Sequence, residues 1–316
     1  MLAFPTMVTI EGRSTVQPAM TFREQLEINS KETGIFSESP APLVAKAFGI
    51  TDTGKVRSAN EDQFLIAELS KAMRVWQTSL TEPMLQHGEE RAHVFLVADG
   101  MGGHKAGERA SALVVLAIEQ FMLNTFKWFF AADSAGAQRV LVQFQSALRE
   151  ADVQIVEESK ADPALSGMGT TVTMAFHLGR QVCIVHVGDS RAYLYRNEAL
   201  HQLTEDHTLT AQMRRSGSLG PDQVLPERFQ NVITNVVGGN ELGVKVEACA
   251  FEVHPGDRLV LCSDGLTEAV TNEEIARILN AEPAPEAAAT SLLGAANAGP
   301  AADNITAVVV RFDLPG

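Results

Sequence analysis

Apolar residues recur at helical spacing in two long segments of the chain. Between residues 107 and 128, Val115, Ile118, Met122 and Phe126 fall on one face of a helix, because residues three, four or seven apart share a face. Between residues 137 and 159 a second apolar set shares one face and consists of Val140, Phe144, Ala147, Leu148, Ala151 and Ile155. The spacing predicts two long amphipathic helices that pack against a core.

Two shorter helices are predicted closer to the C-terminus. The first covers about 272–280 and begins with Thr271 and Glu274 at the spacing of a capping box. The second covers about 285–298 and is rich in alanine. The first 43 residues show no steady period, and they predict an N-terminal extension with one short helix at about 21–28.

Short apolar runs fill most of the remaining chain and predict strands. These runs cover about 44–51, 62–67, 93–98, 170–177, 182–187, 191–196, 199–203, 258–262 and 305–311. The runs between 170 and 203 are joined by only a few residues, and such short links permit antiparallel pairing alone. The pattern favours an α+β layered domain in which helices cover antiparallel sheets.

Charge and cysteine content limit the classes to which the chain can belong. Asp and Glu outnumber Lys and Arg by 39 to 25, and the net charge of -14 argues against a nucleic-acid-binding protein, which needs a basic patch. Three cysteines cannot form a disulfide framework, so a reducing compartment is the simplest interpretation. The most apolar stretch, 112–130, is interrupted by polar residues and is typical of a core helix. We expect a cytoplasmic protein that binds neither nucleic acid nor membranes.

Two predicted strands end in the same dipeptide. The strand at 93–98 is followed by Asp99-Gly100, and the strand at 258–262 is followed, after one serine, by Asp264-Gly265. Asp-Gly is a common turn dipeptide, so either example alone indicates only a turn. Two aspartates at the ends of buried strands are more informative, because binding and catalytic residues are often mounted there.

Other acidic residues are placed in the same way. Glu61 and Asp62 precede one predicted strand, Asp303 precedes the last one, and Asp189 lies between two strands. If these strand ends converge, their carboxylates stay ionised only when cations neutralise them. Oxygen ligands without a Cys/His cluster suit Mg²⁺ or Mn²⁺ better than zinc. Arg57, close to Glu61, is suited to binding two phosphate oxygens at once.

A series of motifs in this order resembles the protein phosphatase type 2C (PPM) family, in its bacterial branch. The motifs are RSANED, ADGMGGH, GMGTT, HVGDSR, LTEDHT, LCSDGLTE and DNIT. The resemblance covers about 44–313 and implies one catalytic domain, preceded by an extension at 1–43. It implies a four-layer αββα sandwich around a dinuclear metal site. Members of the family are metal-dependent Ser/Thr phosphatases.

The resemblance also implies a role for each metal ligand. Asp99 would bridge two Mg²⁺ or Mn²⁺ ions. Asp264 and Asp303 would complete the coordination of one ion, and Glu61 and the backbone carbonyl of Gly100 would serve the other. A hydroxide held between the ions would attack the phosphorus of phosphoserine or phosphothreonine directly.

Further residues would act on the substrate or on water. Arg57 would bind the phosphate, and Asp62 would act through metal-bound water. His104 is a candidate to protonate the leaving group, although animal members of the family have a histidine directly after Asp-Gly, where this chain has Met101. Some bacterial relatives have an aspartate where this chain has Gly167, so the resemblance leaves a third metal ion open.

The remaining motif residues predict mainly structural roles. We expect Asp189 and Arg191 to fix a strand connection, and His186 and His207 to be structural as well. Residues 206–237 correspond to the variable flap near the site in the family.

Two alternative functions remain open at this point. A two-metal phosphatase of small phosphate esters would use the same residues, and a non-catalytic pseudophosphatase would retain the fold as a binding module. The loss of a metal carboxylate would be the mark of the second alternative, and the candidate carboxylates are all present. For a protein phosphatase, the opposing enzyme would be a bacterial Ser/Thr kinase.

Overall fold

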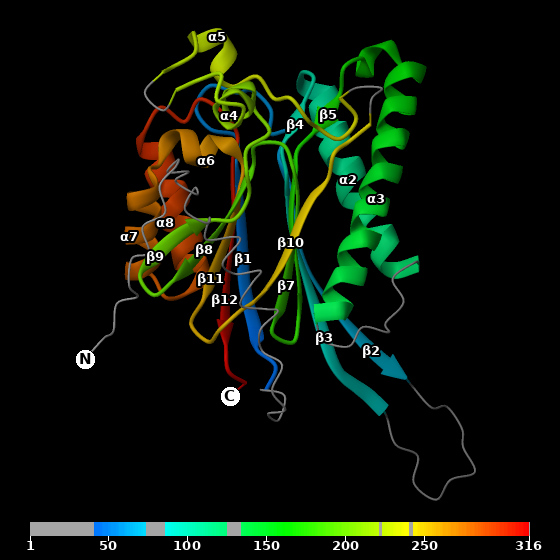
Figure 1. Ribbon diagram of the computed structural model, residues 1–316, viewed down its shortest axis with the longest axis vertical. Coiled ribbons are helices and arrows are strands. Elements are labelled where there is room, and N and C mark those ends of the chain that lie inside the picture. Colours follow the sequence, from blue (N-terminus) through cyan, green and yellow to red (C-terminus); the bar gives the residue numbers. More distant parts are fainter. Residues whose placement is uncertain (1–40, 74–85, 125–133, 221–222, 240–242, 316) are drawn as a thin grey trace, which may run out of the picture.

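A computed structural model describes residues 41–73, 86–124, 134–220, 223–239 and 243–315 (Figure 1). The short helix predicted at 21–28 lies outside the described residues, as does most of the predicted extension.

Two antiparallel five-stranded sheets form the centre of the molecule. The first contains, in spatial order, β1 (Val44–Asp52), β12 (Ile305–Asp313), β11 (Arg258–Cys262), β8 (Arg191–Arg196) and β9 (Ala199–Gln202). The second contains β10 (Glu247–Glu252), β7 (Gln181–Val187), β6 (Val172–Leu178), β3 (Gln86–Ala98) and β2 (Gln63–Met73). A short ladder joins β4 (Gly100–Met101) to β5 (Gly169–Thr170).

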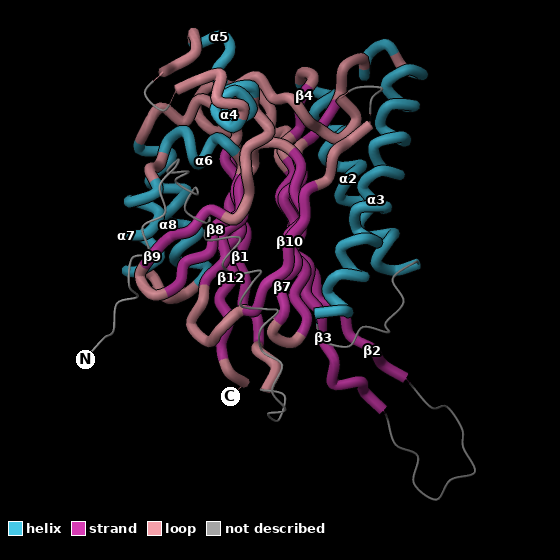
Figure 2. Tube along the Cα trace, in the orientation of Figure 1, coloured by secondary structure: helices cyan, strands magenta, loops and turns pink. Residues whose placement is uncertain are grey.

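Helices cover the outer face of each sheet. In Figures 1 and 2, α2 (His104–Asn124) and α3 (Ser134–Ala161) lie outside the second sheet. On the other side, α6 (Asp264–Ala269), α7 (Asn272–Ala281) and α8 (Pro285–Ala298) cover the first sheet. The predicted αββα sandwich is therefore confirmed.

Three apolar clusters separate the four layers. The first packs α2 and α3 on the second sheet through buried residues such as Ile118, Phe144 and Ile155. The second fills the space between the sheets and includes Phe95 and Leu261. The third lies beneath the helices of the first sheet. Because both faces of each sheet are covered, central strands such as β6 and β12 are almost continuously buried.

Local sequence accounts for most of the element boundaries. Thr271 caps α7 by accepting a hydrogen bond from the Glu274 backbone N–H at 3.3 Å, as the capping-box spacing predicts. The strand β10 was not predicted, because its sequence EACAFE has weak strand propensity. It forms through antiparallel pairing with β7, which holds Cys249 opposite Ile184.

The antiparallel register brings the acidic strand ends together. Gln63, at the start of β2, pairs with Ala98 at the end of β3, so Asp62 and Asp99 leave the second sheet side by side. In the first sheet Cys262, at the end of β11, pairs with Ala307 near the start of β12. Asp264 and Asp303, which flank those positions, therefore leave that sheet close together.

In the part of the chain that the structure describes, no helix has the length and apolar character needed to span a membrane.

The cluster between the sheets makes a testable contribution to stability. Leu261 is fully buried there, so Leu261→Ala should lower the free energy of unfolding by about 2–5 kcal/mol, the range for a buried Leu→Ala change. Val142→Ala, at a side chain on α3 that is 57% exposed, should change it by less than about 0.5 kcal/mol. Urea unfolding measures both, and equal effects would contradict the assigned core.

Candidate metal centre and active site

A pocket of about 400 Å³ opens where the ends of the two sheets meet. It is lined by residues next to the strand ends of both sheets, by β4, by the start of α6 and by loops: Arg57, Glu61, Asp99, Gly100, Met101, Gly102, Gly103, Asn231, Ile233, Asp264, Glu268, Asp303 and Asn304. The lining includes every metal ligand that the sequence predicts. The structure therefore brings together segments that are more than 240 residues apart in the chain.

Asp99 lines the pocket directly after the end of β3. Its backbone N–H donates to Thr171 Oγ1 at 3.0 Å, and its carbonyl accepts from Thr170 Oγ1 at 2.8 Å and from the Thr171 N–H at 2.9 Å. Burial raises the pKa of the Asp99 carboxyl well above its usual value, and the charges of Asp62 and Asp264 raise it further. A rigid backbone thus holds a carboxylate where ionisation is costly.

Asp62 lies just beneath the pocket and is held by two hydroxyl groups. Ser263 Oγ donates to Asp62 Oδ2 at 2.8 Å, and Thr306 Oγ1 donates to the same oxygen at 2.6 Å. Burial raises the pKa of Asp62 and the two hydroxyl hydrogen bonds lower it, and the net result is a pKa of about 6. The other oxygen, Oδ1, is buried without a hydrogen-bond donor, which leaves it available to a water molecule.

Asp264 enters the pocket at the start of α6. Burial raises its pKa well above the usual value, and the charges of Asp189, Glu268 and Asp303 add to the increase. Its Oδ1 is also buried without a donor among the described residues. An acceptor in that position needs either a proton or a cation.

Glu61 depends on glycine for its place in the pocket. A Cβ at Gly107 would collide with Glu61 Oε2, and a Cβ at Gly100 would collide with the carbonyl of Gly107. The Glu61 backbone is fixed as well, because its N–H donates to Asn304 Oδ1 at 2.9 Å and its carbonyl accepts from Ser111 Oγ at 2.7 Å. Glycines on α2 and β4 therefore make room for this carboxylate.

Asp303 forms an ion pair with Arg57. The distance from Arg57 Nη2 to Asp303 Oδ2 is 2.5 Å, and the arginine side chain is 50% exposed. Asp303 Oδ1 accepts a hydrogen bond from the Asn304 N–H at 2.8 Å. Asn304 Nδ2 in turn donates to the carbonyls of Thr53 and Ala59. Asn304 thus connects the loop that carries Arg57 to both Asp303 and Glu61.

The donor set fits divalent cations of the Mg²⁺ and Mn²⁺ type. The available ligands are carboxylate and carbonyl oxygens, and three aspartates at or beside the pocket, Asp62, Asp189 and Asp264, each have a buried oxygen with no donor among the described residues. Among the described residues, no three acidic, histidine or cysteine side chains already form a complete ligand group. Asp303 Oδ2 pairs with Arg57 and its Oδ1 accepts from the Asn304 N–H, so an ion bound by Asp303 would compete with Arg57 for this carboxylate.

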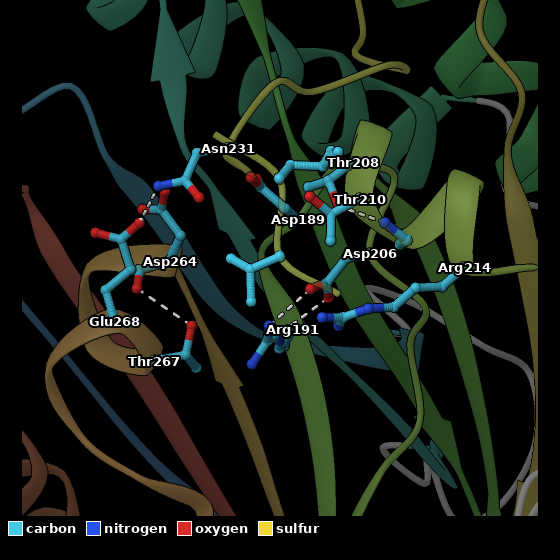
Figure 3. Close-up of a pocket in the computed structure, with 13 residues that line it drawn as sticks. Asp189, Arg191, Asp206, Thr208, Thr210, Arg214, Asn231, Asp264, Thr267 and Glu268 are labelled. Carbon is cyan, nitrogen blue, oxygen red and sulfur yellow. Dashed lines mark hydrogen bonds and ion pairs between the residues drawn. The ribbon is translucent and has the colours of Figure 1, made fainter. Parts of the chain in front are cut away.

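A second pocket of about 300 Å³ adjoins the first and shares Asn231, Asp264 and Glu268 with it. Figure 3 shows those three residues on one side and Arg191, paired with Asp206, on the other. Arg191 Nη2 lies 2.6 Å from Asp206 Oδ2.

Asp189 also lines this second pocket. Burial raises its pKa to about 6, and its Oδ1 has no donor. The structure therefore places Asp189 next to the site, in addition to its position in a strand connection.

Most of the site residues predicted from the sequence lie at one pocket. Arg57, Glu61, Asp99, Gly100, Asp264 and Asp303 line one pocket, and Asp62 lies beneath it. His104 is the first residue of α2, but its side chain lies outside the described part of the chain.

Sequence reasoning did not find several supporting residues. These are Gly107, Ser111, Ser263, Asn231 and Glu268. The sequence did contain a signal for Ser263 and Glu268, because both lie within the LCSDGLTE motif.

Fold and site together define a class of protein: an αββα sandwich with a carboxylate-rich centre for divalent cations at one end of its sheets. A family model described as Protein phosphatase 2C matches residues 83–295. The chain belongs to this family.

Individual relatives agree with this assignment. The serine/threonine phosphatase stp of Listeria monocytogenes is 32% identical over 264 residues, which cover 84% of this chain and 94% of that protein. The crystal structure of the Mycobacterium tuberculosis serine/threonine phosphatase PstP/Ppp matches with a TM-score of 0.68 and 30% identity, covering 86% of this chain and all of that one. A structure of the PstP catalytic domain in complex with two manganese ions matches with a TM-score of 0.64 and 30% identity, covering 86% and 99%.

Repulsion among the carboxylates predicts an effect on stability. In EDTA at pH 8, Asp264→Asn should raise the melting temperature, because it removes a buried charge that faces Asp189, Glu268 and Asp303. Relief of about 1 kcal/mol corresponds to roughly 2–4 °C for a domain of this size. Asp303→Asn should give a smaller increase, because it also breaks the pair with Arg57.

Differential scanning fluorimetry with and without Mn²⁺ tests this prediction. Excess Mn²⁺ should reverse the order, because an ion that binds the folded state stabilises the wild-type chain most. A lower melting temperature for Asp264→Asn than for the wild type in EDTA would contradict the assigned repulsion.

Proposed function

We propose that the chain hydrolyses phosphoserine and phosphothreonine in proteins and uses two Mg²⁺ or Mn²⁺ ions. The observation that carries this proposal is the convergence of carboxylates from both sheets on one pocket whose rim holds Arg57. Relatives named serine/threonine phosphatases, which the chain matches over most of their length, support the same activity.

The metal ligands are proposed to be Glu61, Asp99, Asp264 and Asp303, together with the carbonyl of Gly100. When bound, such ions lower the pKa of water and neutralise charge on the phosphate oxygens. Asp99, which lies against both Asp62 and Asp264, is the ligand best placed to serve both ions. A third ion stays open, because Gly167 stands where some relatives have an aspartate, although Asp264 could contribute to one.

Asp62 is proposed to orient the attacking water. Its Oδ2 is fixed by Ser263 and Thr306, so its Oδ1 has a defined direction. Because Oδ1 is buried without a donor among the described residues, it can accept a hydrogen bond from water.

Arg57 is proposed to bind the substrate phosphate. Its guanidinium lies at the pocket rim, and it already binds the carboxylate of Asp303. Carboxylate and phosphate oxygens present similar acceptors to a guanidinium. Metal binding by Asp303 would therefore release Arg57 for the phosphate.

His104 stays a proposal as the group that protonates the leaving oxygen. It follows Gly103, which lines the pocket, and it begins α2. The proposed boundaries are likewise an extension at 1–43 and a catalytic domain at 44–313. A cytoplasmic location, a part in signal transduction and an opposing Ser/Thr kinase complete the proposal.

The first test is the release of phosphate from a phosphothreonine peptide. Release should require Mn²⁺, stop in EDTA and fall by at least about a thousandfold in Asp264→Ala, since loss of a metal ligand removes several kcal/mol of transition-state stabilisation. Circular dichroism should show that Asp264→Ala remains folded, so that its loss of activity cannot be attributed to unfolding.

Other outcomes would select one of the alternatives. Turnover of small phosphate esters without any turnover of phosphopeptides would favour a small-molecule phosphatase. A folded protein that releases no phosphate from either would favour a binding module.

The role of Arg57 has its own test. Arg57→Ala should lower kcat/KM for the peptide by about 10–100-fold, because it removes a charge-assisted bond of roughly 1.5–3 kcal/mol. Arg277→Ala, at an exposed arginine on α7 that pairs with Glu274, is the matched control and should leave kcat/KM unchanged. Equal kinetics for Arg57→Ala and the wild type would rule out phosphate binding by Arg57.

A further inference from the structure

The flap segment, defined as residues 206–237, forms part of both pockets. Its described helices are α4 (Leu209–Arg215) and α5 (Glu227–Gln230), which lie at the same end of the molecule as β4 and β5 (Figure 1). Asn231 and Ile233 lie on the wall of the candidate active site. The contacts that hold this segment in place therefore determine the shape of the site.

His207, near the start of the flap segment, binds the turn that follows β7. The Gly188 N–H donates to His207 Nδ1 at 2.9 Å, and the His207 N–H donates to the Gly188 carbonyl at 2.8 Å. Gly188 has a φ of +109°, and a Cβ there would collide with Thr171. The turn thus presents a buried N–H that must find an acceptor.

The same histidine also binds the far end of the flap segment. The Thr234 N–H donates to the His207 carbonyl at 2.7 Å, and Thr234 Oγ1 donates to it at 3.0 Å. Asn235 Nδ2 lies 3.0 Å from His207 Nδ1. His207 therefore fastens the beginning and the end of the flap segment to one turn of the second sheet.

The hydrogen bond from Gly188 determines which nitrogen of the neutral His207 ring carries the proton. Because Nδ1 accepts from Gly188, the proton of the neutral ring is on Nε2, 3.3 Å from Glu247 Oε1. The ring stacks on His186 with centroids 4.9 Å apart. Burial lowers the pKa of His186 to about 4, so the stacked partner is neutral at pH 7.

The turn continues to the centre of the site. Ser190 Oγ lies 2.7 Å from Thr171 Oγ1, which accepts the hydrogen bond from the Asp99 N–H. The residue between Gly188 and Ser190 is Asp189, which lines the second pocket. Hydrogen bonds therefore join the flap segment to Gly188 and Ser190 to Thr171 and Asp99, and the backbone of the turn connects the two sets.

We propose that His207 is a positioning residue, which holds the flap segment against the site so that a phosphoprotein substrate can bind. This inference rests on the proposed phosphatase function. His207 is only 4% exposed, so it acts through Gly188 and the flap segment and does not touch substrate. The specific requirement is an acceptor at the position of Nδ1, which an apolar side chain of the same size lacks.

Three variants separate the acceptor from the bulk of the ring. His207→Phe keeps an aromatic ring against His186 and removes the acceptor. His207→Asn places an oxygen near the position of Nδ1, whereas His207→Gln places its polar atoms near Nε2, too far along to meet Gly188. His177→Phe is the matched control, because His177 is 1% exposed and bonds to the Gly179 carbonyl in a hairpin turn away from both pockets.

The measured quantities are KM and kcat for a phosphothreonine peptide and for p-nitrophenyl phosphate, with Mn²⁺. In His207→Phe and His207→Gln the KM for the peptide should rise about tenfold, while kcat and the KM for the small ester change less than about twofold. His207→Asn should restore the KM for the peptide. His177→Phe should lower the melting temperature without changing any KM.

Hydrogen exchange supplies a readout that does not depend on activity. Amides in 208–216 should exchange at least about tenfold faster in His207→Phe than in the wild type or in His207→Asn. If His207→Phe does not fold, the comparison of His207→Asn with His207→Gln decides by the same two measurements.

Several results would overturn the positioning role. An unchanged KM for the peptide, an equal rise for the small ester, no rescue by asparagine, or the same kinetic change in His177→Phe would each do so. A folded wild-type chain with no activity on the peptide would refute the phosphatase function instead, and the exchange rates in 208–216 would still decide the role of His207.

Discussion

Ionised carboxylates repel one another strongly where protein replaces the surrounding water, and one end of this molecule gathers several of them. Burial and mutual charge raise the pKa values of Asp62, Asp99 and Asp264 together. Such an arrangement persists only if the rest of the structure is stable enough to hold it. The two five-stranded sheets, with their outer faces covered by helices and an apolar layer between them, provide that support.

Uncharged hydrogen-bonding groups position most of these carboxylates. Hydroxyl groups of Ser263 and Thr306 fix Asp62, and Asn304 connects Glu61 to the loop beside Asp303. These groups direct each carboxylate without neutralising it, so the charges stay available to cations. Arg57 is the exception, because its ion pair with Asp303 joins the proposed phosphate-binding group to a proposed metal ligand.

The flap segment is held at both ends although it contains only two short described helices. Its two ends meet at His207, and His207 is bound to the turn between β7 and β8. That turn is linked through Thr171 to the backbone of Asp99. The flap segment and the candidate metal centre are therefore supported by the same turn, so a change in one should alter the other.

The sequence by itself determined the layered α+β class, the long helices, most strands and the candidate acidic residues that the structure gathers around one pocket. These follow from period, from short connections and from local motifs. It did not reveal β10, the space that Gly107 leaves for Glu61, or the hydrogen bond between Gly188 and His207. Each of these features depends on residues far apart in the chain. The strand β10 needs β7 as its partner, Glu61 needs the space beside Gly107, and the acceptor of His207 needs the N–H of Gly188. Only the antiparallel register of the two sheets decided which carboxylates meet, since pairing places distant strand ends at one edge.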